Sequence, residues 1–300
     1  MDHRAINRDN WDSRADVHLC ARGYALDKVA DPSWISHVVA FDRPRLGELR
    51  GLDGVHLQCH LGTDTISLVR LGARMTGLDL SPRSIEHARR IAAENKVPVD
   101  YVVSDVYQAV EVLGSGRFDL VYTGIGALCW LPDIRRWAGT VRALLRSGGR
   151  LFVRDAHPVL NSLIAQKVGE DHPDRKQQPW ITGFGEATPS LELPYWEHVE
   201  PLLWRDEYSY AGSEAVASPE SAEWNHALSE IVMAVIDAGL TLELLTEHDS
   251  VPWDALPGMM VADVQGNTDW CDGGSGGVRS AQRNPEAVSP WTRKRCRNKK

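Results

Sequence analysis

A short apolar segment, a tight loop and a second apolar segment ending in a carboxylate open the central part of this chain. The first segment with its loop is Val55–Gly62, a helical pattern starts at Thr63, and the second segment, Met75–Ser81, contains Asp79. Such a strand–helix–strand unit binds a nucleotide-like ligand over its first loop and holds the ribose hydroxyls on the acid after its second strand. The sequence therefore predicts a nucleotide-binding βαβ unit with Asp79 as the ribose ligand.

The loop of this unit is poor in glycine. Only Gly62 is present, and Gln58 and His60 stand where such loops usually carry glycine. Glycine is usual there because the backbone turns sharply and approaches the ligand closely. Taken alone, the loop is therefore a weak motif.

Three further strand patterns follow the βαβ unit. They are Val99–Asp105, Phe118–Gly124, and the last part of Leu144–Val153, which predicts a helix end, a Gly148-Gly149 turn and then a fifth strand. Helical patterns separate them, notably Pro82–Asn95 and Pro132–Leu145, each with a proline at its start. Strand and helix alternate over about 100 residues, which predicts an α/β fold with a parallel sheet covered on both faces.

This ordered set of segments resembles the class I S-adenosylmethionine (SAM)-dependent methyltransferases. Val55–Gly62 is similar to their first motif, Ser104-Asp105-Val106 to their adenine-contacting turn, and Phe118–Val121 to their fourth-strand signature. Leu145–Leu151 is similar to their LLxPGGxL element, with Ser147 in place of proline. The loop LQCHLGTDT, residues 57–65, further resembles that of a bacterial subgroup of these enzymes.

The resemblance implies a Rossmann-like, doubly wound, mostly parallel sheet with helices on both faces. It implies S-adenosyl-L-methionine as the cofactor. It also implies a set of cofactor-binding residues, namely Trp11, Gln58, His60, Gly62, Asp79, Leu80, Asp105, Val106 and Thr123. Helices at the N-terminus fold over the cofactor in this family, so Trp11 and Tyr24 are candidate lid residues.

We expect five parts along the chain. They are an N-terminal helical lid over 1–50, the SAM-binding core over 51–156, an inserted substrate-side segment over 157–220, a helix and strand completing the core over 221–264, and a disordered basic tail over 265–300.

The inserted segment contains two strand-like runs, Ser190–Trp196 and Leu202–Tyr210, broken at Glu200-Pro201. They predict a β hairpin inserted after strand five, beside the active site. Helical periodicity over 221–238 ends at Gly239, and Leu240–His248 predicts a sixth strand.

No strand pattern follows Val264, although most class I methyltransferases have a seventh, antiparallel strand there. The sequence instead becomes rich in glycine and polar residues. Two explanations stay open: the native end has been replaced, for instance by a shifted reading frame, or a genuine tail lacks the strand.

Two histidines are candidate general bases. His157 directly follows the fifth strand, and His198 lies in the expected hairpin. Ligands bind beyond the carboxyl ends of the strands in such sheets. A base is needed only if the acceptor is protonated at the working pH, so a structural role is the alternative for both.

Trp180, Trp196 and Trp204 of the inserted segment predict a mostly apolar pocket for a small-molecule acceptor. Ordinary packing of large rings under long loops is the alternative.

Composition excludes several classes of function. The chain carries a net charge of −8, and the stretch from Gln265 carries +5, which leaves −13 on the rest and argues against a nucleic-acid substrate. The chain has no long apolar run and no apolar segment near Met1, so we expect neither a membrane span nor a secretory signal. Five scattered cysteines fit the cytoplasm, and no ligand spacing predicts a metal site.

The sequence thus predicts transfer of a methyl group from SAM to a small-molecule acceptor. A SAM-binding but catalytically impaired protein is one alternative, because of the glycine-poor loop and the absent last strand. A nicotinamide-dependent oxidoreductase is another, but it expects Gly-x-Gly-x-x-Gly and leaves Asp105 and the Gly148-Gly149 turn unexplained.

Overall fold

The computed structural model describes residues 2–164, 190–211, 214–252, 255, 260–262 and 268–270. The helices in this part of the chain are α1 His3–Leu19, α2 His37–Leu46, α3 Thr63–Arg70, α4 Pro82–Glu94, α5 Ala109–Leu113, α6 Ile134–Leu144, α7 Pro158–Ser162 and α9 Leu228–Asp237. The strands are β1 Asp53–Leu57, β2 Arg74–Asp79, β3 Asp100–Val103, β4 Phe118–Thr123, β5 Leu145–Val153, β6 Leu163–Ile164, β7 Ser190–Leu191, β8 Leu202–Arg205, β9 Glu220–Glu223, β10 Ser250–Val251, β11 Met260–Ala262 and β12 Thr268–Trp270.

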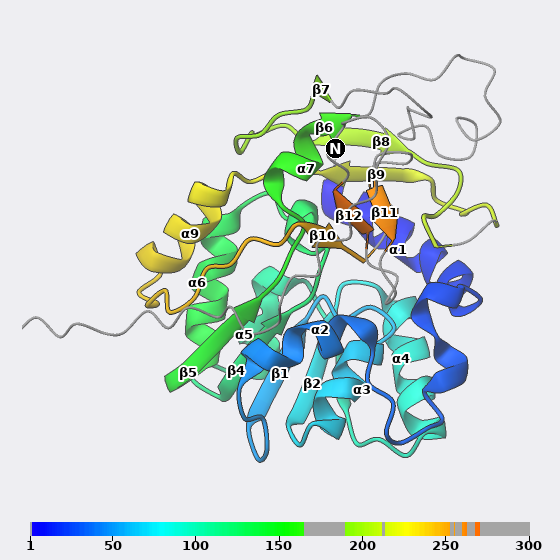
Figure 1. Ribbon diagram of the computed structural model, residues 1–300, viewed down its shortest axis with the longest axis vertical. Helices are drawn as coiled ribbons and strands as arrows, with labels where there is room; N and C mark the ends of the chain where they lie inside the picture. The colour runs from blue at the N-terminus through cyan, green and yellow to red at the C-terminus, as the bar shows by residue number, and fades with distance from the viewer. Residues whose placement is uncertain are drawn as a thin grey trace, which may run out of the picture. The chain divides into compact units, whose positions relative to one another are not determined.

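Five strands form one sheet in the order β3-β2-β1-β4-β5. Each neighbouring pair in this sheet is parallel. Helices α2 and α3 cover one face, and α5 and α6 cover the other (Figure 1). The expected Rossmann-like, doubly wound α/β fold is confirmed.

Alternation of side chains along β4 explains why both faces of the sheet are covered. Val121 packs with Trp137 of α6 on one face. Leu120 and Tyr122 point to the other face, where they pack with Val39 of α2. A strand with apolar residues on both faces needs cover on both, as is typical of the central strands of parallel sheets.

The Gly148-Gly149 pair lies within β5 and does not precede it. The pairing of β4 with β5 shifts register between Phe118 and Leu120, which marks a bulge. A Cβ atom on Gly149 would lie 2.8 Å from the carbonyl oxygen of Phe118. Glycine is therefore required there by the close approach of two backbones.

The inserted segment forms antiparallel strand pairs, but with partners other than those expected. β7 pairs with β6, and β8 pairs with β9. The runs Ser190–Trp196 and Leu202–Tyr210 therefore do not pair with each other. Strand partners separated by long connections cannot be deduced from the apolar pattern of either strand.

The helix expected over 221–238 begins only at Leu228, because residues 220–223 form β9. Its end is as expected, since Gly239 follows the helix with a φ of 86°. The sixth strand expected over Leu240–His248 is wrong, because no strand is present there. Leu240 packs against the core while Leu244 is 60% exposed, so only the start of this run is buried.

A short strand does follow Val264, contrary to expectation, although the described residues add no strand beyond β5 to the central sheet. β12 lies beyond Val264 and pairs antiparallel with β10 and β11 in a separate sheet. The remainder of the expected tail, 265–267 and 271–300, and Trp180 of the inserted segment lie outside the described residues.

Helix α1 is attached to the edge of β9 by asparagine side chains. The side chain of Asn7 donates to the carbonyl oxygen of Ala222 and accepts from its amide, at 2.8 Å in both cases. Asn10 donates to the carbonyl oxygen of Ser218 at 2.8 Å. These amide groups replace a neighbouring strand and fix α1 between β9 and α4 (Figure 1).

No helix in the described ranges combines the length and the apolar character that crossing a membrane requires.

Candidate cofactor site

The loop between β1 and α3 has the left-handed backbone conformation that glycine favours, although two of its residues in that conformation are not glycine. Gln58 and His60 both have positive φ angles, 58° and 47°. For a residue with a side chain the left-handed conformation costs roughly 1–2 kcal/mol. Strain of this kind persists only where the surroundings enforce it, and it is concentrated at functional sites.

Two hydrogen bonds enforce this backbone. The side-chain amide of Gln58 donates to the carbonyl oxygen of Ala127, in the loop after β4, at 2.8 Å. The backbone amide of His60 donates to Oδ2 of Asp79 at 2.8 Å. The loop is therefore held from both sides, by the ends of β4 and β2.

Gly62 is the one loop position that cannot accept a side chain. It has a φ of 74°, and a Cβ atom there would lie 2.2 Å from the hydroxyl oxygen of Tyr101. That hydroxyl donates to the carbonyl oxygen of Gly62 at 3.3 Å. Tyr101 of β3 thus packs against the loop and supports its backbone at Gly62.

Replacing Gly62 with alanine should lower the free energy of unfolding by about 2 kcal/mol more than the same change at Gly114, because overpacking adds to the backbone penalty. Gly114 is a matched control, with a φ of 85° and no atom within 4 Å of the place that a Cβ atom would take. Urea denaturation of both variants measures the difference. Equal losses would show that Tyr101 does not support the loop.

Asp79 lies at the end of β2 and is buried. Its Oδ2 accepts from His60, and its Oδ1 accepts from the amide of Ser81 at 2.9 Å. Burial raises the pKa of Asp79 to about 6, and these amide hydrogen bonds oppose the rise. A carboxylate oxygen can accept more than one hydrogen bond, so Asp79 can still receive two ribose hydroxyls.

Asp105 lies at the same edge of the sheet. The amide of Ser104 donates to the carbonyl oxygen of Asp79 at 2.9 Å, which fixes the two strand ends side by side. Asp105 accepts from the amide of Tyr107 at 2.9 Å and lies 3.4 Å from Nε of Arg4 on α1. Val106 follows in a buried turn. Leu80, beside Asp79, is half-buried.

Two polar atoms at this edge are buried without a partner in the described structure. They are Oγ1 of Thr123 and Oε1 of Gln58. Thr123 pairs with Leu57 across the β1–β4 ladder, directly before Gln58. Buried polar atoms are nearly always satisfied in native proteins, so this pair indicates a ligand at the ends of β1 and β4, where SAM is expected.

Helix α1 places aromatic side chains over the loop. The ring of Trp11 lies 5.0 Å from that of His60 and 5.2 Å from that of Trp130, measured between centroids. Nδ1 of His18 lies 2.8 Å from Nε2 of His60, and Nδ1 of His60 lies 2.9 Å from Oγ of Ser84. The hydroxyl of Tyr24 lies 3.0 Å from Nδ1 of His18.

The His18–His60 pair is neutral. Burial, with a smaller contribution from the charge of Arg14, lowers the pKa of His18 to about 3. Burial also lowers the pKa of His60 well below its ordinary value. Nε2 of His18 lies 2.5 Å from Oγ of Ser209, so the chain of hydrogen bonds links the loop to the segment after β8.

Folded-state pKa values below the ordinary one mean that the unfolded chain binds more protons, so stability is lost as pH falls through about 6.5. Replacing His18 with glutamine should therefore flatten the pH dependence. We expect the stability difference between wild type and variant to shrink by about 1 kcal/mol from pH 7.5 to about pH 5.5. Urea denaturation at both pH values tests this, and an unchanged difference would contradict it.

The two histidines expected as bases lie apart from this network. Nδ1 of His157 caps α7 by accepting from the amide of Val159 at 3.2 Å, and its Nε2 lies 2.6 Å from Oε1 of Glu247. His198 bonds to the carbonyl oxygen of Glu200. Within the described ranges neither ring contacts the β1–α3 loop, so a catalytic role for either remains only a sequence-based prediction.

Neither of the two described tryptophans expected to line an acceptor pocket has a ring contact with the β1–α3 loop in the described structure. Trp196 is 63% exposed and packs on Tyr195, and Trp204 is half-buried. The tryptophan at the loop is Trp11, and the ring packed against it is that of Trp130, which was not predicted as part of the site. Its place directly after β4, where ligands bind in such sheets, was the available signal.

Asp155 organises the loop after β4. Its carboxylate accepts from the amides of Gly126, Ala127 and Leu128 at 2.7, 3.1 and 2.7 Å. Because Ala127 in turn receives the side chain of Gln58, this loop and the β1–α3 loop are fixed to each other.

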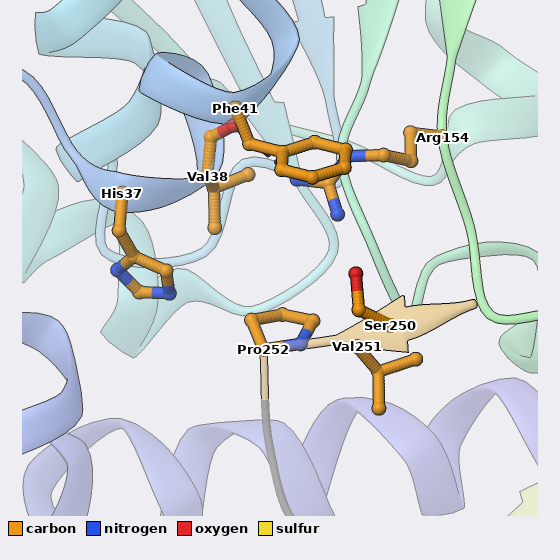
Figure 2. A pocket seen from close by; sticks show the side chains of 7 residues that line it. All are labelled: His37, Val38, Phe41, Arg154, Ser250, Val251 and Pro252. Atoms are coloured by element: carbon orange, nitrogen blue, oxygen red, sulfur yellow. Dashed lines mark hydrogen bonds between the residues drawn. The ribbon is translucent and has the colours of Figure 1, made fainter. Parts of the chain in front are cut away.

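A pocket lies at the carboxyl end of β5, lined by His37, Val38, Phe41, Arg154, Ser250, Val251 and Pro252 (Figure 2). Figure 2 shows the ring of Phe41 beside the side chain of Arg154, with the hydroxyl of Ser250 pointing toward them. Nε of Arg154 lies 2.5 Å from Oδ1 of Asp42, and the hydroxyl of Tyr122 donates to Oδ2 at 2.6 Å. This pocket is thus built on a buried ion pair.

Comparison with known proteins agrees with this geometry. Residues 55–151 match the family described as "Methyltransferase domain". A ubiquinone biosynthesis O-methyltransferase from Methylobacterium sp. (strain 4-46) is 35% identical over 124 residues, which are 41% of this chain and 49% of the relative. One from Xanthomonas euvesicatoria is 30% identical over 152 residues, 50% of this chain and 62% of the relative. The match thus spans about half to three fifths of these relatives.

The fold is also found in a solved structure. An S-adenosylmethionine-dependent methyltransferase from Mesorhizobium loti superposes with a TM-score of 0.50 and 22% identity, over 72% of this chain and 85% of the other. The chain therefore shares the fold of this methyltransferase, and residues 55–151 match a methyltransferase domain, in agreement with the resemblance seen in the sequence.

Proposed function

We propose that this protein binds SAM at the carboxyl ends of β1, β2, β3 and β4 and transfers its methyl group to a small-molecule acceptor. The observation that carries the proposal is the unpartnered pair of buried atoms, Thr123 Oγ1 and Gln58 Oε1, beside the strained loop. The O-methyltransferase names of the relatives support a hydroxyl acceptor.

Each part of the site has a role in this proposal. Asp79 accepts the ribose hydroxyls, and Asp105 with the amide of Val106 reads the adenine. SAM supplies an electrophilic methyl group when bound. The protein contributes mainly by holding two reactants in line and excluding water, and Trp11 on α1 covers the loop for that purpose.

Two alternatives to methyl transfer are a catalytically impaired protein and a nicotinamide-dependent oxidoreductase. An impaired enzyme was suggested by the missing loop glycines, but Gln58 and His60 adopt the left-handed backbone that glycines would give. A nicotinamide-dependent enzyme gains no support, because residues 55–151 match a methyltransferase domain. Free thiols at Cys20, Cys59 and Cys129 favour a cytoplasmic location, which we include in the proposal.

Calorimetric titration of the purified chain with SAM, S-adenosylhomocysteine and NADH tests the proposal. We expect saturable binding of the first two compounds and none of NADH. Binding of NADH alone would replace the proposal with the oxidoreductase alternative. Failure to bind any of the three would contradict it.

A further inference from the structure

A second buried polar cluster lies beside the cofactor site. It consists of the buried Arg14 on α1, the buried Asp206 directly after β8, and the half-buried Glu223 at the end of β9. Arg14 is 5% exposed and Asp206 is 7% exposed. One guanidinium nitrogen of Arg14 lies 3.7 Å from Oδ2 of Asp206, too long for a hydrogen bond. The charges are thus buried but loosely paired.

Several polar atoms of this cluster have no partner among the residues that the structure describes. They are Nε of Arg14, Oδ1 of Asp206, Oγ of Ser221 and Oδ1 of Asn10. All four side chains are more than nine-tenths buried. Buried polar groups without partners are rare and costly, so four of them on facing elements, α1 and the β8–β9 pair, indicate a site that receives a polar ligand.

The cluster is separated from the cofactor loop by two aromatic rings. The guanidinium carbon of Arg14 lies 5.6 Å from the ring centroid of Trp11 and 5.9 Å from that of Trp130. Trp11 in turn contacts His60 of the loop. The amide of Trp224 donates to the carbonyl oxygen of Cys129 at 2.7 Å, which brings the end of β9 to the loop after β4.

Glu223 is the free group of this cluster. Its carboxylate forms no hydrogen bond or ion pair in the described structure, whereas the carboxylates of Asp79 and Asp155 are occupied by backbone amides. Burial, helped by the charge of Asp206 and opposed by that of Arg14, raises the pKa of Glu223 to about 7. A base with its pKa near the working pH is the most effective proton acceptor.

We propose that Arg14, Asp206 and Glu223 form the acceptor subsite, and that Glu223 is the general base for an acceptor that carries a hydroxyl group. The inference rests on the proposed methyl transfer. The acceptor hydroxyl gives its proton to Glu223 while its oxygen bonds to the methyl carbon, and the electron pair of the broken carbon–sulfur bond stays on sulfur. Glu223 then releases the proton to water.

The charged and titratable groups around Glu223 belong to three elements. Glu223 interacts electrostatically with Arg14 on α1, with Asp206 after β8 and with Cys129 in the loop after β4. Glu223 must be ionised to act, so the rate should rise with pH and level off above the pKa of this carboxyl. Burial also raises the pKa of Asp206 to about 6, so Asp206 titrates in the same pH range.

The test uses methyl-labelled SAM with four named probes: phenol, catechol, benzoate and aniline. We expect label on phenol or catechol only. Glu223→Gln should lower kcat at least about a hundredfold and remove the rise with pH near neutrality. Glu223→Asp should restore part of the rate. Glu220→Gln, which changes an exposed glutamate on the same strand, is the matched control and should keep the wild-type rate.

Two further measurements separate the possible failures. SAM affinity by calorimetry should be unchanged within about twofold in Glu223→Gln, since Glu223 contacts the acceptor and not the cofactor. Because the raised pKa of Glu223 costs stability as pH increases, Glu223→Gln should lose less stability than wild type between pH 5 and about pH 8. A wild type that binds no SAM would overturn the proposed function and this inference together.

If SAM binds, the remaining outcomes concern the inference alone. Label on benzoate or aniline only, or on no probe, would overturn the hydroxyl acceptor. A Glu223→Gln variant with the wild-type rate and pH profile would overturn the role of Glu223.

Discussion

Replacing Asp79 with alanine is expected to raise the dissociation constant for SAM at least about tenfold, since a hydrogen bond to a charged group contributes roughly 1.5–3 kcal/mol. The structure adds a second loss to that of the ribose contacts. Asp79 also holds the amides of His60 and Ser81, so its removal releases the strained backbone of the loop. Calorimetry with SAM measures the effect.

Two control variants identify the cause of this loss. Asp79→Asn keeps the shape but replaces one acceptor oxygen by a donor, so it should weaken SAM binding less than alanine does. Asp100→Ala changes an exposed residue at the start of the neighbouring strand and should leave affinity unchanged. Unchanged SAM affinity in Asp79→Ala would show that the ribose lies elsewhere.

Replacing Arg154 with methionine should lower the free energy of unfolding by about 3–5 kcal/mol, because breaking a buried ion pair leaves an uncompensated charge. That charge is the carboxylate of Asp42, whose side chain is 1% exposed. Tyr122 would remain its hydrogen-bond donor. The ring of Phe41, which Arg154 covers, would lose a cationic contact as well.

Chemical denaturation of three variants tests this. The double change Asp42→Asn with Arg154→Met should recover part of the loss, because no charge then remains buried. Arg74→Met removes an exposed pair with Asp53 and should cost no more than about 1 kcal/mol. Equal losses for Arg74→Met and Arg154→Met would contradict the importance of burial.

The central sheet was predictable from sequence because its strands are short apolar runs that end in chemically distinctive residues. The five predicted segments correspond to β1–β5, and Asp79 and Asp105 lie at the ends of β2 and β3, as expected. Parallel strands buried on both faces need no partner-specific pattern, since most positions that face a helix are apolar.

The surrounding elements were less predictable because they depend on contacts between distant parts of the chain. β9 was assigned to a helix, yet it is fixed by Asn7, 215 residues away, and by pairing with β8. Leu240–His248 has the composition of a strand but gained no partner in the described structure. The local sequence pattern indicates which secondary structure a segment can form. Whether it forms a strand depends on whether a strand edge is available for pairing.

The residues of the candidate site also divide into those that the local sequence predicts and those that depend on contacts between distant parts of the chain. Asp79, Asp105 and Gly62 could be predicted as site residues because they occupy motifs, and Trp11 because N-terminal helices cover the cofactor in the family that the sequence resembles. His18 was missed, since its link to the loop is a contact with His60, 42 residues later, which no local pattern reveals. Glu223 was missed for the same reason, because its burial and its neighbours arise only when β9, α1 and the loop after β4 come together.

A crystal structure of the purified chain with S-adenosylhomocysteine tests the central claim most directly. We expect the ribose hydroxyls on Asp79, the adenine amine on Asp105, and a hydrogen-bond partner for Thr123 or Gln58 at the ends of β1 and β4. Difference density for the ligand away from the β1–α3 loop, or a bound ligand that leaves Asp79 without a ribose contact, would contradict the assignment of this site.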